Sequence, residues 1–354
     1  MRVTRVAAER VAVPLAAPFE VALGVIDTAD TVVVRLETDA GLVGYGEGAG
    51  VTFVTGETSE SVLGAIRLLE PVVVGQSPFA IDHVHRGMDQ ALVGHGSAKA
   101  ALDLALYDLM GQAAGLPLFR FLGGVAGRVE IDHTIGLADP AAMAARAAEL
   151  VAEGYRELKV KAGADDAQDR AAIAAIRAAA PAARLKVDAN QGWTPRQAVL
   201  LADEYAKHGV AAIEQPVPHW DRAGLAWVRS HSPIPVMADE SCFTPHDAAD
   251  LVSLGAVDAI NIKLMKCGGI YPALQIDAIA EAAGVTTMVG CMLESRLAIA
   301  AGAHLAAARP NVKDADLDSF RDFDDTSLVR SAFAFTPPVI ALTEAPGLGV
   351  DLAW

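Results

Sequence analysis

The chain has 354 residues, 53% hydrophobic and 20% charged, which is enough for one large barrel-type domain or for two domains. Its 44 acidic and 28 basic residues give a formal net charge of −16, which argues against nucleic acid or an anionic membrane as a partner. The three cysteines lack paired or metal-type spacing, so we read them as free thiols and expect a cytoplasmic location.

The first part of the chain changes from strand-like to helix-like patterning. Residues 1–60 alternate apolar and polar side chains, as in "TVVVRLETDAGLVGYGEG", and predict β-strands. Residues 57–122 carry helical spacing instead, and the Gly-Leu-Pro at 115–117 predicts a stop. We therefore expect an α+β domain over residues 1–125.

From about residue 129, short apolar runs alternate with Ala-rich helical stretches. Three of these stretches open with capping pairs, Asp139-Pro140, Thr194-Pro195 and Thr244-Pro245. This alternation predicts a parallel sheet. A polar residue or glycine closes each of eight runs and recurs every 24 to 27 residues, which predicts a closed (β/α)8-type barrel over residues 126–320. In such a barrel, the carboxyl ends of the strands share one mouth. The closing residues are Thr134, Lys161, Asp188, Glu214, Asp239, Lys263, Gly290 and Asp316.

The last segment, residues 321–354, has no clean helical pattern. Its sequence "SAFAFTPPVIALTEAPGLGV" looks extended and rich in turns. No low-complexity tract or linker separates the N-terminal domain from the barrel, so we expect a tight interface between these two domains. We expect the last segment to return to the N-terminal domain.

Three carboxylates close three successive strands: Asp188, Glu214 and Asp239. Side by side in a barrel mouth they would repel one another unless a hard divalent cation lay between them. Oxygen-only ligands favour Mg²⁺ or Mn²⁺ over Zn²⁺. Any one of these acids could instead be a helix cap, but three in consecutive units favour a metal site.

Lysines flank this acidic trio. Lys161 closes the strand before it and Lys263 the strand after it, so a substrate on the metal would have an amine on each face. Burial and a neighbouring cation can lower a lysine pKa from about 10.4 to roughly 7–8, where it can act as a base. Lys159 shares a strand face with Lys161 and could neutralise a substrate carboxylate. The set suits removal of a proton next to a carboxylate through an enediolate, with return of a proton from the other face.

The segments "KVK", "DANQGW", "EQP", "ADES", "NIKLMKCGG" and "PGLGV" resemble the enolase superfamily, muconate-lactonizing-enzyme subgroup. The resemblance implies an α/β fold in which an α+β capping domain covers a modified (β/α)7β TIM barrel. It also implies two specificity loops, near residues 16–28 and 50–57. It implies that Lys161 and Lys263 are the acid/base pair, that Asp188, Glu214 and Asp239 bind Mg²⁺, and that Asn190 and Glu240 support these ligands.

Within this subgroup, "DADLDS" is similar to the segment of dipeptide epimerases in which a D-x-D binds the substrate α-ammonium group. Here the pair is Asp316 and Asp318. The alternative is an ordinary polar loop. The resemblance also implies that main-chain groups near Cys291 and Met292 line the peptide group, and that Thr134 contacts the substrate.

One departure concerns the first specificity loop, where L-Ala-D/L-Glu epimerases of this type tend to carry an arginine. Gly24 stands at the matching position, and the nearest charges, Glu20 and Asp27, are acidic. We therefore expect a weakened preference for glutamate at the second residue of the dipeptide, with apolar or cationic residues tolerated.

The leading hypothesis is a Mg²⁺-dependent dipeptide epimerase that works as a homo-oligomer. The alternatives are an N-acylamino acid racemase, an o-succinylbenzoate synthase or a cycloisomerase with the same core residues. A barrel that only binds a ligand is disfavoured by the complete set of lysines and carboxylates.

Overall fold

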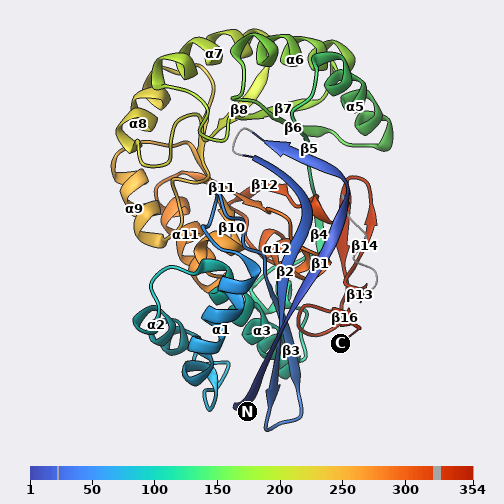
Figure 1. Ribbon diagram of the computed structural model, residues 1–354, viewed down its shortest axis with the longest axis vertical. Coiled ribbons are helices and arrows are strands. Elements are labelled where there is room, and N and C mark those ends of the chain that lie inside the picture. The colour runs from blue at the N-terminus through green and yellow to red at the C-terminus, as the bar shows by residue number, and fades with distance from the viewer. Residues whose placement is uncertain (22–23, 322–327, 354) are drawn as a thin grey trace.

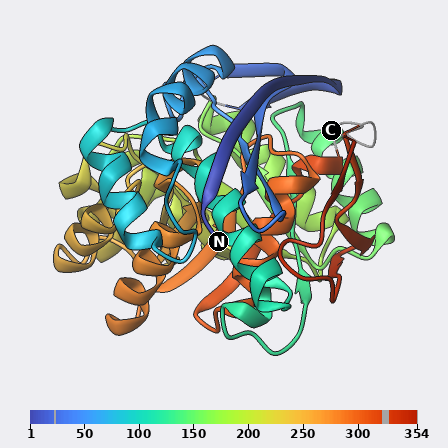
Figure 2. The same ribbon diagram turned by 90° about the horizontal axis from the view of Figure 1, so that it is seen from below.

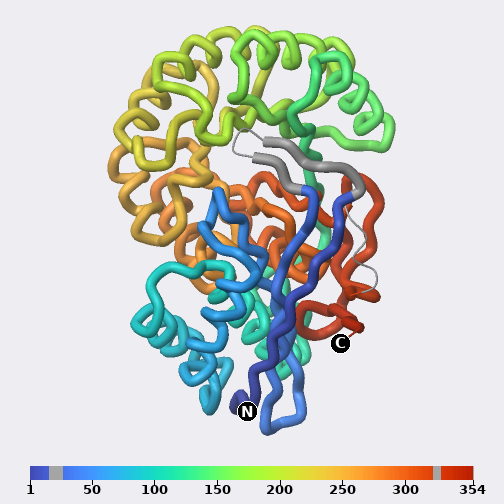
Figure 3. Tube along the Cα trace, in the orientation of Figure 1, coloured from blue at the N-terminus to red at the C-terminus, as the bar shows by residue number. Residues whose placement is uncertain are grey.

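The computed structural model describes residues 1–21, 24–321 and 328–353. Its N-terminal part is an antiparallel sheet of β1 (Val3–Val21), β2 (Gly24–Thr38) and β3 (Val43–Gly48), paired in that order. Four helices follow, α1 (Ser59–Val73), α2 (Ile81–Ala91), α3 (Gly96–Ala114) and α4 (Leu118–Phe121). The predicted change from strands to helices is confirmed, and helices α1–α3 and strand β3 lie together at one end of the molecule (Figures 1 and 3).

The remainder of the chain is built around an eight-stranded parallel sheet, with its strands in sequence order from β5 to β12. The backbone N–H of Asp132 donates to the carbonyl of Ala315 at 3.0 Å, which joins the two edges of the sheet. Helices α5 to α9 form an outer arc around the strands (Figure 1). The strands are β5 (His133–Ile135), β6 (Glu157–Lys161), β7 (Arg184–Asp188), β8 (Val210–Glu214), β9 (Val236–Ala238), β10 (Ala259–Lys263), β11 (Thr286–Gly290) and β12 (Val312–Asp316).

Each of the first seven barrel strands is followed by a helix. Among the described residues, β12 is followed by the short 3₁₀ turn η1 (Ser319–Arg321) and then by strands. The barrel is therefore (β/α)7β, as the family resemblance implied, and the eightfold repeat inferred from spacing lacks its last helix. The helices are α5 (Pro140–Glu153), α6 (Asp166–Ala179), α7 (Pro195–Lys207), α8 (Arg222–His231), α9 (Pro245–Ser253), α10 (Leu264–Cys267), α11 (Ile270–Ala282) and α12 (Arg296–Ala308).

The predicted helix starts are confirmed. Asp139 accepts hydrogen bonds from the first turn of α5. Thr194 and Thr244 each form a capping box at the start of α7 and α9, and a proline follows each of them. These caps satisfy N–H groups that a helix leaves unpaired, so the helices of these three barrel units begin at fixed residues.

The C-terminal segment consists of short strands, β13 (Val329–Ser331), β14 (Phe333–Thr336), β15 (Val339–Leu342) and β16 (Asp351–Leu352). β14 and β15 form a sheet with β4 (Arg128–Glu130), at the side of the molecule that is red in Figures 1 and 2. The Leu118 N–H donates to Gly347 O at 2.8 Å, and the Leu348 N–H donates to Asp108 Oδ1 at 2.8 Å. The segment thus contacts α4 and α3.

We propose the same three-part division as the sequence predicts: residues 1–125, 126–320 and 321–354. The first boundary falls between α4 and β4, and the second falls within η1. Within the described ranges, no helix combines the length and the apolar composition that crossing a membrane would require.

Strand β3 packs against α3 through alternating glycines, Gly44, Gly46 and Gly48. A Cβ at Gly46 would lie 2.0 Å from Ala101 O, and Cβ atoms at the other two would lie 2.3 and 2.5 Å from carbonyl oxygens of the same helix. Because these neighbours are backbone atoms, they cannot move aside. The "GYGEG" pattern is therefore a packing requirement between sheet and helix.

We expect Gly46→Ala to lower the free energy of unfolding by about 3 kcal/mol, because the added methyl overpacks the contact with α3. The matched control is Gly64→Ala in α1, where a Cβ meets no atom of the described structure within 4 Å. That change should be neutral or should stabilise by about 0.5–1 kcal/mol. Urea denaturation of both variants tests this expectation, and equal stabilities would contradict it.

Candidate active site

The three predicted metal ligands converge at the mouth of the barrel. Asp188 ends β7, Glu214 ends β8, and Asp239 directly follows β9, so neighbouring parallel strands deliver them to one place. One carboxylate oxygen of each lies within 4.8 Å of the others, and all three side chains are at most 1% exposed. Like charges buried this closely require a cation between them.

The donor set fits a hard divalent cation. Glu214 Oε2 and both Asp239 carboxylate oxygens are buried and accept no hydrogen bond of normal geometry from the described residues, although lysines lie close. Three carboxylates with spare lone pairs offer the oxygen-only environment that Mg²⁺ and Mn²⁺ prefer. The residues present therefore fit the predicted metal.

The two predicted acid/base residues, Lys161 and Lys263, lie on opposite sides of the three carboxylates. Lys161 Nζ lies 2.7 Å from Asp188 Oδ2, and Lys263 Nζ lies 2.7 Å from Asp239 Oδ2. Their strands, β6 and β10, stand on either side of the three carboxylate-bearing units in the sheet order. Each amine is thus placed at a different edge of the same acidic centre.

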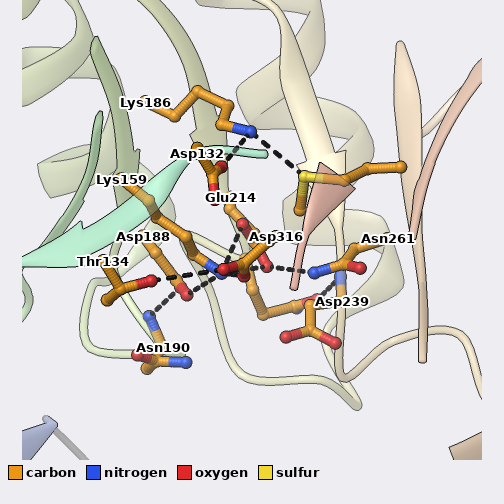
Figure 4. A network of polar contacts seen from close by, with 12 residues as sticks. Asp132, Thr134, Lys159, Lys186, Asp188, Asn190, Glu214, Asp239, Asn261 and Asp316 are labelled. Carbon is orange, nitrogen blue, oxygen red and sulfur yellow. Dashed lines mark hydrogen bonds and ion pairs between the residues drawn. The ribbon is translucent and has the colours of Figure 1, made fainter. Parts of the chain in front are cut away.

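Lys159 lies among the carboxylates themselves. Its Nζ is 3.0 Å from Asp188 Oδ2, 3.0 Å from Glu214 Oε2 and 2.8 Å from Asp316 Oδ2, and Figure 4 shows it pointing into this ring of acids. Burial lowers its pKa, but the three carboxylates raise it by more, so the pKa of Lys159 is well above its usual value. The group therefore stays cationic and can neutralise added negative charge.

The pKa of Lys263 reflects two opposing effects of its surroundings. Burial lowers the pKa of this lysine, but the adjacent Asp239 carboxylate raises it by more, and the net shift is upward. The sequence showed that a cation and burial could act on the lysine. It did not show that the amine would lie 2.7 Å from a metal-ligand carboxylate.

The predicted D-x-D residues lie together at the end of β12. Asp316, Asp318 and Cys291 each place one side-chain atom within 4.8 Å of the others. Thr134 contacts both acids: its N–H donates to Asp318 Oδ2 at 2.7 Å, and its hydroxyl donates to Asp316 Oδ1 at 3.3 Å. Burial raises the pKa of Asp316, but Lys159 lowers it by more, so Asp316 stays ionised.

The N–H groups of the loop after β11 are already engaged within the protein. The Cys291 N–H donates to Asp316 O at 2.9 Å, and the Met292 N–H donates to Glu294 Oε2 at 2.5 Å. Any lining of a substrate by the main chain of these two residues therefore falls to their carbonyl oxygens. The Cys291 Sγ lies 3.9 Å from Asp318 Oδ1.

The two predicted supporting residues connect the metal ligands to each other. The Asn190 N–H donates to Asp188 Oδ1 at 3.0 Å, and its side-chain amide donates to Glu240 Oε1 at 3.2 Å. Glu240 follows Asp239 directly in the chain. Burial and the nearby Asp239 and Asp188 carboxylates raise the pKa of Glu240 to about 7.

Three further residues of the site did not emerge from the sequence. Asn261 donates from its amide to Glu214 Oε1 at 2.7 Å, and Lys266 Nζ lies 2.6 Å from Asp239 Oδ1. A Cβ at Gly290 would lie 2.5 Å from Asn261 Oδ1, which explains why a glycine closes β11. Glu294 is buried, and burial raises its pKa to about 8, so it carries a proton at neutral pH. The sequence did contain a signal for Asn261. The alternation in "AINIK" places Asn261 on the same strand face as Lys263, and therefore towards the site.

The predicted specificity segments are only partly described. Ala22 and Leu23 lie outside the described residues, and no side chain is described for residues 16–26, so the expectation for Gly24 stays a prediction. The backbone on either side belongs to β1 and β2 and is not an irregular loop. Residues 50–57 form turns, and the buried Glu57 anchors them because its Oε2 accepts the Ser97 N–H at 3.1 Å.

Comparisons with known proteins agree with this geometry. Residues 3–123 match the family model "Mandelate racemase / muconate lactonizing enzyme, N-terminal domain", and residues 142–354 match "Enolase C-terminal domain-like". A hydrophobic dipeptide epimerase from Enterococcus faecalis is 44% identical over 353 residues, covering 99% of this chain and all of that protein. An L-Ala-D/L-Glu epimerase from Bacillus subtilis is 41% identical and covers 99% of this chain and 97% of that protein.

Solved structures give the same relationship. The dipeptide epimerase from E. faecalis, complexed with Mg and the dipeptide L-Leu-L-Tyr, has a TM-score of 0.97 and 44% identity, with 99% of each chain covered. The substrate-liganded L-Ala-D/L-Glu epimerase from B. subtilis also has a TM-score of 0.97, with 40% identity and full coverage of both chains. The chain therefore belongs to the mandelate racemase / muconate lactonizing enzyme family of the enolase superfamily.

Proposed function

We propose that this protein is a Mg²⁺-dependent dipeptide epimerase that inverts the Cα of the C-terminal residue by a 1,1-proton transfer. One observation carries the proposal: three convergent carboxylates lie between Lys161 and Lys263, with the Asp316/Asp318 pair beside them. Relatives over the full length of the chain are named dipeptide epimerases, and one is solved with Mg and a dipeptide.

The three carboxylates form the proposed metal-binding site. Asp188, Glu214 and Asp239 would hold Mg²⁺, which when bound offsets the negative charge that develops on the substrate carboxylate. Lys159 adds a fixed positive charge at the same position, since its ammonium already lies among the carboxylates. Because the group is buried and does not need to reorient, it stabilises the enediolate as that charge develops.

The two flanking lysines perform the proton transfer. One of Lys161 and Lys263 removes the Cα proton as a neutral amine, and the other, as an ammonium, donates a proton to the opposite face. The order reverses for the other epimer. Since a lysine is needed in both states, neither position tolerates a residue that cannot hold a proton.

The Asp316/Asp318 pair selects substrates with a free amino group. Both side chains are buried, at 3% and 5% exposure, and burying two acids at one place favours a cationic partner. The α-ammonium group of a dipeptide supplies such a cation. N-acylated amino acids do not, so they should bind less well.

The side chain of the second residue is proposed to be apolar. Residues 16–28 and 50–57 contain no lysine or arginine, so neither segment supplies a cation for a glutamate side chain. The relative from E. faecalis is named a hydrophobic dipeptide epimerase, whereas that from B. subtilis is named for L-Ala-D/L-Glu. The acidic Glu20 and Asp27 leave a cationic side chain as the second choice.

We further propose that the chain forms homo-oligomers and is cytoplasmic. Trp220 is 73% exposed and Trp227, on α8, is 42% exposed, and exposed tryptophans are typical of protein interfaces. The three cysteines are unpaired thiols, which suits a reducing compartment.

The runner-up function is N-acylamino acid racemisation, with the synthase and cycloisomerase reactions behind it. A relative from Bacillus cereus that is 35% identical is named an N-succinyl-L-Arg/Lys racemase. The same lysines and carboxylates would serve that reaction. The buried Asp316/Asp318 pair disfavours it, because such substrates carry no α-ammonium group.

We expect a panel of free-amine dipeptides, incubated in D₂O with Mg²⁺, to take up one deuterium at the Cα of the C-terminal residue. Peptides with an apolar second residue should exchange fastest. EDTA should abolish exchange, and added Mg²⁺ should restore it. Mass spectrometry gives the readout. Exchange of N-acylated amino acids without exchange of free-amine dipeptides would overturn the proposed function.

The lysine pair predicts an asymmetric loss of activity. Lys161→Ala and Lys263→Ala should each abolish exchange from one epimer, by at least about 10³-fold, because each removes the base on one face. Exchange should be measured separately from the L,L and L,D forms of one dipeptide. Lys207→Ala, at the end of α7, is the control and should leave both rates unchanged. Full two-way turnover in either active-site variant would refute the assignment.

A further inference from the structure

Helix α12 carries only half of a capping box in its own sequence. Ser295 is its N-cap residue, and the Ser295 hydroxyl accepts the Leu297 N–H at 3.2 Å. In a capping box, a polar side chain three residues further on accepts the N–H of the N-cap residue. The residue at that position is Ala298, which has no such group. Helices α7 and α9, by contrast, complete the box within their own first turns, with Gln197 and Asp247.

Glu47, on β3 of the N-terminal domain, supplies the missing acceptor. Its Oε1 accepts the Ser295 N–H at 2.8 Å. Its Oε2 accepts the Ala298 N–H at 3.1 Å and the Ser295 hydroxyl at 2.6 Å. The side chain is fully buried, and the positive end of the helix dipole favours a carboxylate at this place. The cap of α12 is therefore completed across the domain boundary, by a residue 248 positions earlier in the chain.

Residues 291–294, immediately before α12, lead from β11 past Asp316. At the start of this segment, the Cys291 N–H donates to the Asp316 carbonyl at 2.9 Å. At its end lies Ser295, which Glu47 holds. The N–H groups of its first two residues are engaged within the protein, so its carbonyl groups are the ones left to contact a dipeptide. The position of those carbonyl groups depends on how both ends of the segment are held.

Glu47 also lies close to the second specificity segment in the chain. Strand β3 ends at Gly48, and residues 50–57 begin two positions later. On the same side of the domain boundary, Ala29 of β2 packs with Leu293 in a small apolar cluster. Glu47 therefore joins the barrel segment before α12 to the strand that leads into the specificity segment.

We propose that Glu47 is a positioning residue that completes the cap of α12 from the N-terminal domain and thereby fixes residues 291–294 for binding the peptide group of the dipeptide. The inference rests on the proposed function. Glu47 acts through the main chain of that segment and not on the reacting carbon. Its loss should therefore weaken substrate binding more than proton transfer.

Steady-state kinetics with the best dipeptide of the D₂O panel test the inference. Glu47→Gln keeps the size of the side chain, but an amide has one acceptor oxygen, so its NH₂ group must face one of the N–H donors. We expect KM to rise about tenfold while kcat changes by less than about threefold, the pattern of lost substrate binding. An unchanged KM in folded Glu47→Gln would overturn the inference.

A double variant tests whether the cap itself is the cause. Glu47→Ala should raise KM at least as much as Glu47→Gln. Glu47→Ala combined with Ala298→Glu returns a carboxylate at the third position of α12, where a capping box accepts the Ser295 N–H. We expect this combination to recover most of the loss. A double variant with the same KM as Glu47→Ala would refute the capping role.

Ser295→Ala decides the test if neither Glu47 variant folds. It removes the hydroxyl bonded to Glu47 Oε2 and leaves the main-chain N–H in place. We expect KM to rise about threefold, because one of the three hydrogen bonds to Glu47 is lost. A wild-type KM in this variant would contradict the inference.

Asp108→Asn is the matched control. Asp108 is a buried carboxylate of the same domain that accepts two main-chain N–H groups, from Tyr45 at 3.0 Å and from Leu348 at 2.8 Å, and neither donor belongs to the active-site segment. The variant should lower the free energy of unfolding and leave KM unchanged. A rise in KM equal to that of Glu47→Gln would show that any loss between the domains acts alike, and would overturn the specific role.

Amide hydrogen exchange of the full chain gives a readout independent of catalysis. Peptides that contain Ser295 and Ala298 should exchange faster in Glu47→Gln than in wild type, and should not do so in Asp108→Asn. Unchanged protection of these amides in Glu47→Gln would overturn the inference. Failure of the wild-type protein to exchange any free-amine dipeptide would overturn the proposed function and this inference with it, whereas an active wild type with an unaffected Glu47→Gln variant overturns the inference alone.

Discussion

The structure depends on pairing buried carboxylates with lysine ammonium groups at the mouth of the barrel. Asp188, Glu214 and Asp239 are brought together by three successive parallel strands, and none of them has access to bulk water. Separating ions from water is costly, so the carboxylates must be matched by cations at close range. Lys159, Lys161 and Lys263 supply that match within the chain, and their positions follow from the same strand register.

A second layer of charge lies deeper in the barrel. Lys186 Nζ is 2.6 Å from both Asp132 and Glu157 and 3.2 Å from the Met288 sulfur, and Figure 4 shows it beyond the catalytic layer. Burial raises the pKa of Asp132 by more than the adjacent Lys186 lowers it, which shows how strongly burial opposes the charged form of a carboxyl group. The interior of this barrel is therefore largely ionic, and the apolar core lies between strands and helices. Buried ion pairs of this kind fix geometry more than they add stability.

The sequence predicted the parts of the site that repeat. The 24-to-27-residue spacing located Lys161, Asp188, Glu214, Asp239 and Lys263, because a parallel strand and its helix require a nearly constant length of chain. The spacing wrongly predicted a complete eighth β/α unit. Among the described residues, β12 is followed by η1 and by strands and not by an α-helix. The spacing also missed the buried Glu294, and it missed Asn261 and Lys266, whose roles come from contacts with Glu214 and Asp239, far away in the chain.

The sequence by itself determined the order of strands and helices, the residue types at the strand ends and hence the class of chemistry, because these depend on local periodicity. Only the tertiary structure decided which groups touch. It placed the Lys263 ammonium against Asp239, engaged the N–H groups of Cys291 and Met292, and set Glu47 against the first turn of α12. Contacts of that kind depend on how the ends of separate strands and loops meet in space, and local pattern does not encode that geometry.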